Sequence, residues 1–101
     1  MEDKRLHTRV PIDVTLVCEG PQATSFAAHG KDISVGGMFV RSSNQPPFGT
    51  ALTIVLRLPG SKKDVRLPAI VRWTKEDGFG VQFGLLGAFE THLISELMKA
   101  G

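Results

Sequence analysis

Most of the chain alternates apolar and polar residues with a period of two, which is the pattern of half-buried β-strands. After Pro11, Val14, Leu16 and Cys18 share one parity, and Gly20-Pro21 ends the run. The same pattern predicts five more strands, bounded by Gly, Pro, Ser, Asn and Asp residues, over 24–33, 37–41, 50–58, 65–73 and 79–83. Six short strands joined by turns predict a mainly β protein, an antiparallel barrel or sandwich.

The final segment changes to helical spacing. Over 87–99 the chain places apolar residues opposite polar ones, which predicts one amphipathic α-helix that covers an open side or end of the sheet. A second copy of the chain could meet the same face, so a homodimer stays open. The apolar residues of this spacing begin just before the helix, at Leu86, and continue with Phe89, Leu93, Ile94, Leu97 and Met98.

In the strand over 65–73, parity predicts which side chains face the core. Trp73 has the parity of Val65 and Val71, so we expect its side chain in the core, with Arg72 on the outer face. Pro68 cannot donate a backbone hydrogen bond, which indicates an edge strand or a bulge at that position.

The stretch 32–37 has the composition of a small polar binding edge. If it is extended, Asp32 and Ser34 point outward together, and Gly36-Gly37 can take positive φ or let a ligand or another backbone approach. The alternative is a hairpin turn in which Asp32 and Ser34 cap local backbone amides.

Half of residues 1–10 are charged and the segment cannot bury itself, so we expect a flexible arm followed by one barrel domain over 11–101. Arg5 and Arg9 stand four positions apart, which places them on one side of an extended or helical arm. Taken alone, the spacing favours a solvated charged tail.

Composition restricts the classes of function. A length of 101 residues fits one domain, and a formal charge of +2 is too weak to indicate a nucleic-acid polymer as partner. The single Cys18 excludes an intrachain disulfide and predicts a buried thiol in a reducing compartment. With neither a leader nor a long apolar run in the sequence, we expect a cytoplasmic protein without membrane insertion.

Catalytic patterns are missing from the sequence. His7, His29 and His92 lie in three different contexts, and no metal-ligand spacing, carboxylate pair or phosphate-binding loop stands out. We therefore expect a binding module that is not an enzyme and holds neither a metal nor a cofactor.

Two motifs in order resemble a known signature. Arg5-x-x-x-Arg9 followed by Asp32-x-Ser34-x-x-Gly37 resembles the two-part motif of the PilZ domain, the bacterial receptor family for cyclic di-GMP. The stretches 38–40, 69–73 and 78–83 resemble the family as well. The resemblance implies a six-stranded antiparallel PilZ-type β-barrel with a C-terminal α-helix, and an arginine arm that folds over the ligand.

The resemblance also assigns roles that suit the ligand's chemistry. A guanidinium fork can bond guanine or phosphate and can stack on a purine, which fits Arg5 and Arg9. Asp32 can accept from a guanine N1–H and N2–H edge or from an arginine, and Ser34 can donate to a phosphate or base edge.

The remaining assignments concern the backbone and the arm. At Gly36 and Gly37 the absence of a Cβ would let main-chain amides approach the ligand. Lys4 is an auxiliary candidate in a region where the family selects one nucleotide or a stacked pair.

These features predict a stand-alone adaptor whose arm becomes ordered when cyclic di-GMP binds. The adaptor would then signal through an unidentified effector protein. One alternative is a PilZ-like interaction module that does not bind nucleotide. Another is a small nucleic-acid-binding barrel, which the low charge and the lack of an evident outer aromatic strip disfavour.

Overall fold

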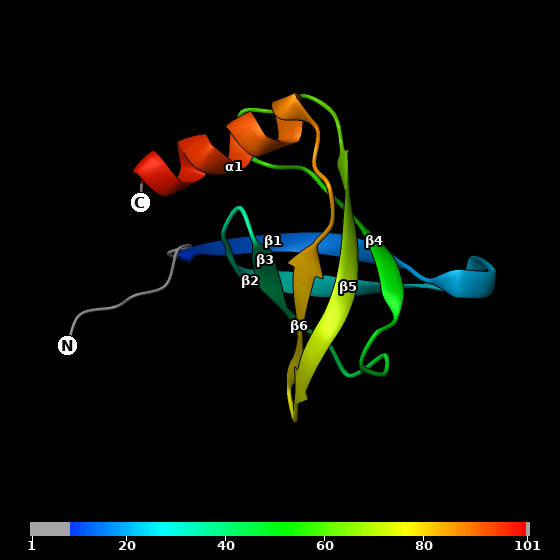
Figure 1. Cartoon of the computed structure of the whole chain (residues 1–101). Coiled ribbons are helices and arrows are strands. Elements are labelled where there is room, and N and C mark those ends of the chain that lie inside the picture. The colour runs from blue at the N-terminus through cyan, green and yellow to red at the C-terminus, as the bar shows by residue number, and fades with distance from the viewer. Residues whose placement is uncertain (1–8, 101) are drawn as a thin grey trace.

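The computed structural model describes residues 9–100, and within them six strands close into one antiparallel barrel (Figure 1). The strand order around the barrel is β1-β2-β3-β6-β5-β4, and β4 pairs back onto β1. This confirms the expected six-stranded barrel with a C-terminal helix. The elements are β1 (Val10–Glu19), a 3-10 turn (Pro21–Ala23), β2 (Ser25–Ile33), β3 (Gly37–Arg41), β4 (Ala51–Leu56), β5 (Val65–Lys75), β6 (Gly78–Phe83) and α1 (Ala88–Ala100).

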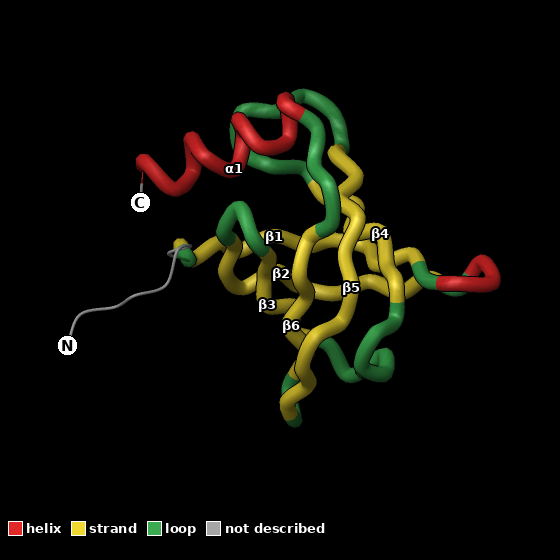
Figure 2. Tube along the Cα trace, in the orientation of Figure 1, coloured by secondary structure: helices red, strands yellow, loops and turns green. Residues whose placement is uncertain are grey.

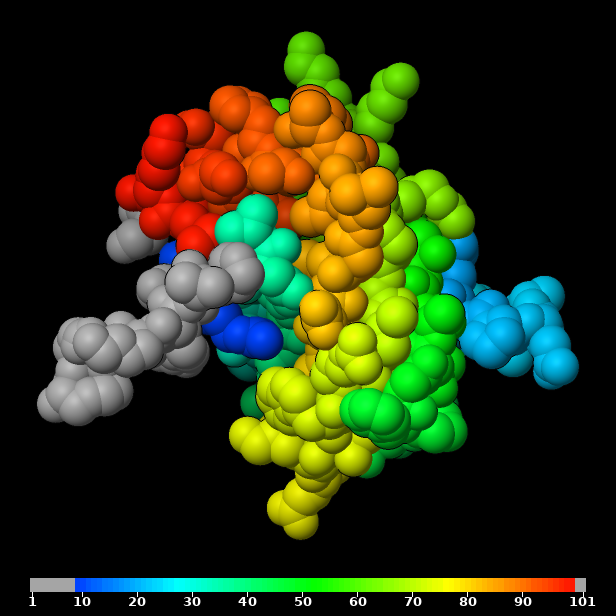
Figure 3. Space-filling view, in the orientation of Figure 1, coloured from blue at the N-terminus to red at the C-terminus, as the bar shows by residue number. Residues whose placement is uncertain are grey.

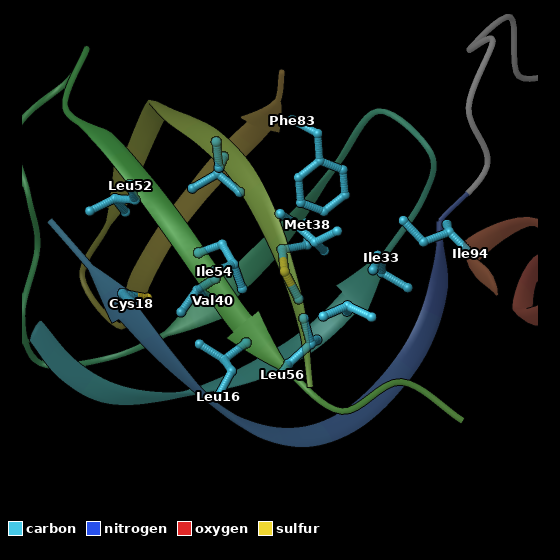
Figure 4. Packing of buried hydrophobic residues seen from close by; sticks show 14 of the residues in the cluster. Leu16, Cys18, Ile33, Met38, Val40, Leu52, Ile54, Leu56, Phe83 and Ile94 are labelled. Atoms are coloured by element: carbon cyan, nitrogen blue, oxygen red, sulfur yellow. The ribbon is translucent and has the colours of Figure 1, made fainter. Parts of the chain in front are cut away.

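Alternation along the strands fills the barrel interior. Leu16 and Cys18 on β1 meet Ile54 on β4 and Val40 on β3, and all four side chains are at most 2% exposed (Figure 4). The parity read from the sequence in these strands is therefore the parity of the core. Burying such aliphatic side chains is the main favourable contribution to folding, at about 1.5–3 kcal/mol each.

The helix α1 lies across one end of the barrel, joined to β6 by a loop (Figure 2). Leu93 and Ile94 are 6% and 0% exposed and belong to the barrel core, whereas Phe89 on another side of the helix is 55% exposed. The amphipathic pattern thus corresponds to a helix that closes the core. Among the described residues 9–100, none of the helical segments has the length and hydrophobicity of a membrane span.

The prediction that Trp73 lies in the core is wrong. Val71 pairs with Val81, and Trp73 pairs with Gly80, the residue next to Val81 on β6. β5 therefore holds one extra residue, Arg72, between these two pairs. Such a bulge reverses the parity that follows it. The Trp73 side chain consequently faces outward and is 40% exposed.

Pro68 sits inside a closed barrel and not on an edge strand. It pairs with Thr53 of β4, while its carbonyl accepts from the amide of Gly84, directly after the end of β6. The backbone N and O of one strand residue point toward the same neighbouring strand. The nitrogen of Pro68 therefore points past the end of β6, where no strand residue needs a hydrogen-bond donor. The bulge of β5 lies further along, next to Trp73.

β1 begins at Val10, which is 9% exposed, so the last residue of the segment expected as an arm, 1–10, is part of the barrel. A second irregularity follows, because the β1–β2 register shifts between Pro11 and Val14. The start of β1 is thereby held beside the end of β2, where Val10 pairs with Ile33.

Candidate functional site

An ion pair joins Arg9, the last residue of the N-terminal lead-in (residues 1–9, before β1), to the end of β2. The register of β1 and β2 pairs Pro11 with Asp32. Arg9 stands two residues before Pro11, close enough for its side chain to reach the Asp32 carboxylate. Arg9 Nη1 donates to Asp32 Oδ1 at 2.7 Å, and the two side chains are 31% and 35% exposed. Two residues that the sequence places 23 positions apart therefore form one partly buried charged pair.

The same carboxylate oxygen accepts a second bond, from β3. The backbone N–H of Phe39 donates to Asp32 Oδ1 at 3.2 Å. Asp32 pairs with Phe39 after a register shift between Gly30 and Asp32 in β2, and this irregularity lets the carboxylate reach the β3 backbone. Asp32 is thus held by groups from both neighbouring segments of the barrel.

Ser34 opens the turn between β2 and β3 and is only 2% exposed, so it does not point outward with Asp32 as the extended interpretation expected. β2 ends at Ile33, and the strand alternation does not continue into the turn. The Ser34 amide donates to the Gly37 carbonyl at 2.8 Å, and its hydroxyl accepts from the Gly36 amide at 3.1 Å. This is the local capping that the turn alternative describes.

The two glycines of the turn serve the barrel backbone. Positive φ occurs among the described glycines at Gly49 and Gly60, and not at Gly36 or Gly37. A Cβ on Gly37 would lie 2.1 Å from the Val81 carbonyl oxygen of β6. The sequence left open whether the glycines let a ligand or another backbone come close. At Gly37 it is the backbone of β6 that comes close.

Comparison with models of protein families matches residues 2–98 of this chain to the PilZ domain. The chain belongs to the PilZ domain family. This family binds cyclic di-GMP, and its domains are ligand-binding and regulatory. In sequence, no curated protein matches this PilZ domain significantly.

Solved PilZ structures share the barrel. The PilZ domain of YcgR from Escherichia coli, solved with c-di-GMP, has a TM-score of 0.75 at 11% identity, covering 97% of this chain and 91% of that one. The PilZ domain of CeSA from a cellulose-synthesizing bacterium has a TM-score of 0.73 at 17% identity, covering 92% and 96%. At such identities the likeness shows the fold.

A third structure is a longer protein. The inhibitor of motility MotI/DgrA from Bacillus subtilis has a TM-score of 0.75 at 17% identity, and the match covers 98% of this chain. This PilZ domain spans about half of that protein, since the match covers 52% of it.

The structure brings together part of the set predicted from the two motifs. Arg9 and Asp32 are bonded to one another, and the turn that carries Ser34, Gly36 and Gly37 follows directly. Lys4 and Arg5 lie outside the described residues. Among residues 9–100, no group of three or more His, Cys, Asp or Glu side chains is arranged to hold a metal ion.

Sequence reasoning missed an aromatic pair beside this site. Phe39 and Trp73 stack on the outer surface, with ring centroids 5.4 Å apart and planes 9° from parallel. The expectation that the barrel has no aromatic strip on its outer face is therefore wrong, because the bulge in β5 was not visible in the alternation. One available signal was Gly80, whose lack of a side chain leaves room for a large neighbour on the adjacent strand.

Proposed function

We propose that this PilZ domain is a receptor for cyclic di-GMP that binds the nucleotide between its N-terminal lead-in and the β2–β3 turn. The single observation that supports this most is the Arg9–Asp32 pair, which joins the two motifs of the signature at one place on the barrel. The family and the fold agree with this function.

The geometry suits a ligand with two guanines and two phosphates. Arg9 carries five N–H donors in a planar fork, and one nitrogen is engaged with Asp32, so others remain for phosphate or for guanine O6 and N7. On Asp32, Oδ1 takes both bonds observed within the described residues. We assign Oδ2 to the N1–H and N2–H edge of a guanine.

The remaining site residues complete the proposal. Arg5 supplies the second guanidinium and Lys4 an auxiliary charge, both from the motif alone. Gly36 and Gly37 shape the turn at which the nucleotide approaches. Ser34 contributes to the site mainly by holding this turn, because its hydroxyl is buried and accepts from the Gly36 amide.

The output of the receptor is proposed to be a protein contact. PilZ domains are regulatory, and one structural neighbour is an inhibitor of motility. Binding would order the lead-in against the barrel, and an effector protein would read the changed surface.

Titration calorimetry with cyclic di-GMP tests the receptor proposal. We expect binding to the native protein and a loss of about 10- to 100-fold in affinity for Arg9→Ala, because a hydrogen bond to a charged group contributes about 1.5–3 kcal/mol. Arg57→Ala is the matched control, since Arg57 makes an exposed ion pair with Asp64 elsewhere on the barrel. Its affinity should equal that of the native protein.

The opposite result would support a second function. Ser34 and Asp32 already bond to groups of the protein itself, as they would in an interaction module that does not bind nucleotide. If the folded native protein binds no cyclic di-GMP at micromolar concentrations, the receptor proposal is wrong and this alternative replaces it.

A further inference from the structure

An exposed cluster of aromatic and cationic side chains covers the outer face of β5 and β6. The bulge in β5 turns Trp73 outward beside Arg72, so two consecutive residues face the same side. The Trp73 ring reaches across β6 to stack on Phe39 of β3. We call this group the aromatic–cation surface; it comprises Phe39, Phe48, Arg72, Trp73 and Lys75.

The aromatic pair is held in place by the strand beneath it. Gly80 of β6 lies between β3 and β5, pairing with Phe39 on one side and Trp73 on the other. A Cβ on Gly80 would meet the Trp73 ring at 2.1 Å, so the indole occupies the space above that bare backbone. A large exposed side chain in a fixed position loses little conformational entropy when it enters an interface.

Cations lie over these rings. The Lys75 ammonium is 5.6 Å from the Phe39 centroid and 5.8 Å from the Trp73 centroid. The Arg72 guanidinium is 6.0 Å from the centroid of Phe48, whose side chain is 68% exposed, and its Nε donates to Gln82 Oε1 at 2.8 Å. Distances near 6 Å are those of cation–π contacts.

The second half of β5 and the β3–β4 loop, which carry four of the five side chains of this surface, lie next to each other. In Figure 3 the yellow atoms of the second half of β5 and the green atoms around the β3–β4 loop lie side by side on the face toward the viewer. Glu76 and Asp77 form the turn at the far end of β5, so these two acidic residues lie at the edge of the surface, next to Lys75 in the chain.

One hydrogen bond connects this surface to the proposed nucleotide site. Asp32 Oδ1 accepts from Arg9 and from the backbone N–H of Phe39, whose ring belongs to the stacked pair. A ligand that changes the bonding of Asp32 therefore acts on the strand that carries Phe39. The two regions are adjacent, so the state of one can alter the other.

We propose that the aromatic–cation surface is the docking site for the effector protein, through a segment that combines carboxylates with apolar side chains; this rests on the proposed receptor function. Trp, Phe and Arg are enriched in protein interfaces, and Trp and Arg among the residues that dominate their affinity. Carboxylates complement the Arg72 and Lys75 charges, and apolar groups complement the exposed rings.

The geometry favours a protein segment over a nucleic acid. Bases bind to such barrels by stacking on open ring faces. Here the Phe39 and Trp73 rings each use one face on the other, the Lys75 ammonium lies close to both of them, and the Arg72 guanidinium lies over Phe48. Carboxylates can bond to those cations without displacing them.

Selection from a random peptide library displayed on phage, against the immobilised full chain, tests this proposal. Selections run with and without cyclic di-GMP. We expect enriched peptides rich in Asp, Glu and apolar residues, whose affinity falls about tenfold or more for Trp73→Ala and for Lys75→Glu. The controls are Val17→Ala, an apolar side chain 38% exposed on β1, and Lys62→Glu in the exposed β4–β5 loop; both should retain binding.

The proposal would be overturned by the absence of acidic peptides from both selections, by peptides that bind Trp73→Ala as well as the native protein, or by a Trp73-dependent dimer in sedimentation. Oligo(dT) binding that depends on Trp73 and displaces the peptides would overturn it too.

Calorimetry with cyclic di-GMP on Trp73→Ala separates the docking proposal from the receptor proposal. If that variant binds nucleotide normally, a failed selection refutes the docking site and leaves the receptor proposal intact.

Discussion

Gly80 and Trp73 occupy complementary space across neighbouring strands. The indole fills the volume above Gly80, and the ring continues to Phe39 on the far side. The conformational freedom of glycine is not needed at Gly80, because its φ is not positive. What matters there is the missing side chain.

Replacing that glycine should displace the tryptophan. We expect Gly80→Ala to reduce the free energy of unfolding by about 1–3 kcal/mol, the usual effect of overpacking, and to shift the emission of Trp73, the only tryptophan. Urea denaturation followed by fluorescence measures both effects. Gly84→Ala is the control, since its nearest contact would be Pro68 at an ordinary 3.6 Å. Equal effects in the two variants would contradict this account.

The Cys18 thiol is buried in the barrel, and this burial raises its pKa from 9.0 to about 12. The native protein at pH 8 therefore holds almost no thiolate, and Cys18 should react with Ellman's reagent only as fast as the barrel opens. Urea should accelerate the reaction strongly. Rapid labelling of the native protein would show that this part of the barrel opens easily.

The same pKa shift makes a prediction about alkaline stability. Between pH 9 and about 12 the folded state keeps the Cys18 proton and the unfolded state loses it, so the free energy of unfolding falls as pH rises. Below pH 9 the contribution is constant. Cys18→Val removes the titrating group, and its unfolding free energy, measured from pH 8 to 11, should fall less steeply than that of the native protein.

At the level of elements, α1 acts as the closing part of the core. Ile94 is fully buried and lies near Ile33 at the end of β2 (Figure 4). The helix thereby covers the barrel end at which β2 passes into the turn with Ser34. Loss of its packing should weaken the barrel and not only the helix.

Truncating the buried helix residue tests this role. Ile94→Ala should reduce the free energy of unfolding by about 2–4 kcal/mol, because it removes fully buried methyl groups and leaves a cavity. Phe89→Ala on the same helix is the control. Because the Phe89 side chain is 55% exposed, its removal should reduce the free energy of unfolding much less. Urea denaturation gives both values. A small effect at Ile94 would mean that the barrel core closes without the helix.

At the scale of the whole molecule, Asp32 connects the lead-in with β3 and the aromatic pair. If cyclic di-GMP binds at Asp32, the emission of Trp73 should change during the titration, with excitation at a wavelength that guanine does not absorb. The Asp32→Ala variant should lose the change, and GMP should serve as a weak-binding control. Binding seen by calorimetry without any change in emission would contradict this connection.

Much of the fold follows from local patterns. Period-two alternation identified the strands, and helical spacing identified 87–99 where the structure has Ala88–Ala100. These patterns are readable because each strand or helix must bury one face, whatever its neighbours are. The family motifs pointed to Arg9 and Asp32 as ligand contacts, and the structure joins these two residues in an ion pair.

Pairing between strands decided the rest. The bulge beside Trp73 depends on how β5 and β6 align, and a single extra residue reverses which face a side chain takes. Gly37 is required by the Val81 carbonyl on another strand, and Ser34 is buried by the turn that follows β2. Such contacts join residues far apart in the chain. Sequence by itself therefore determined the elements, the core parity and the charged motif, whereas the tertiary structure decided what each element presents to its neighbours and to solvent.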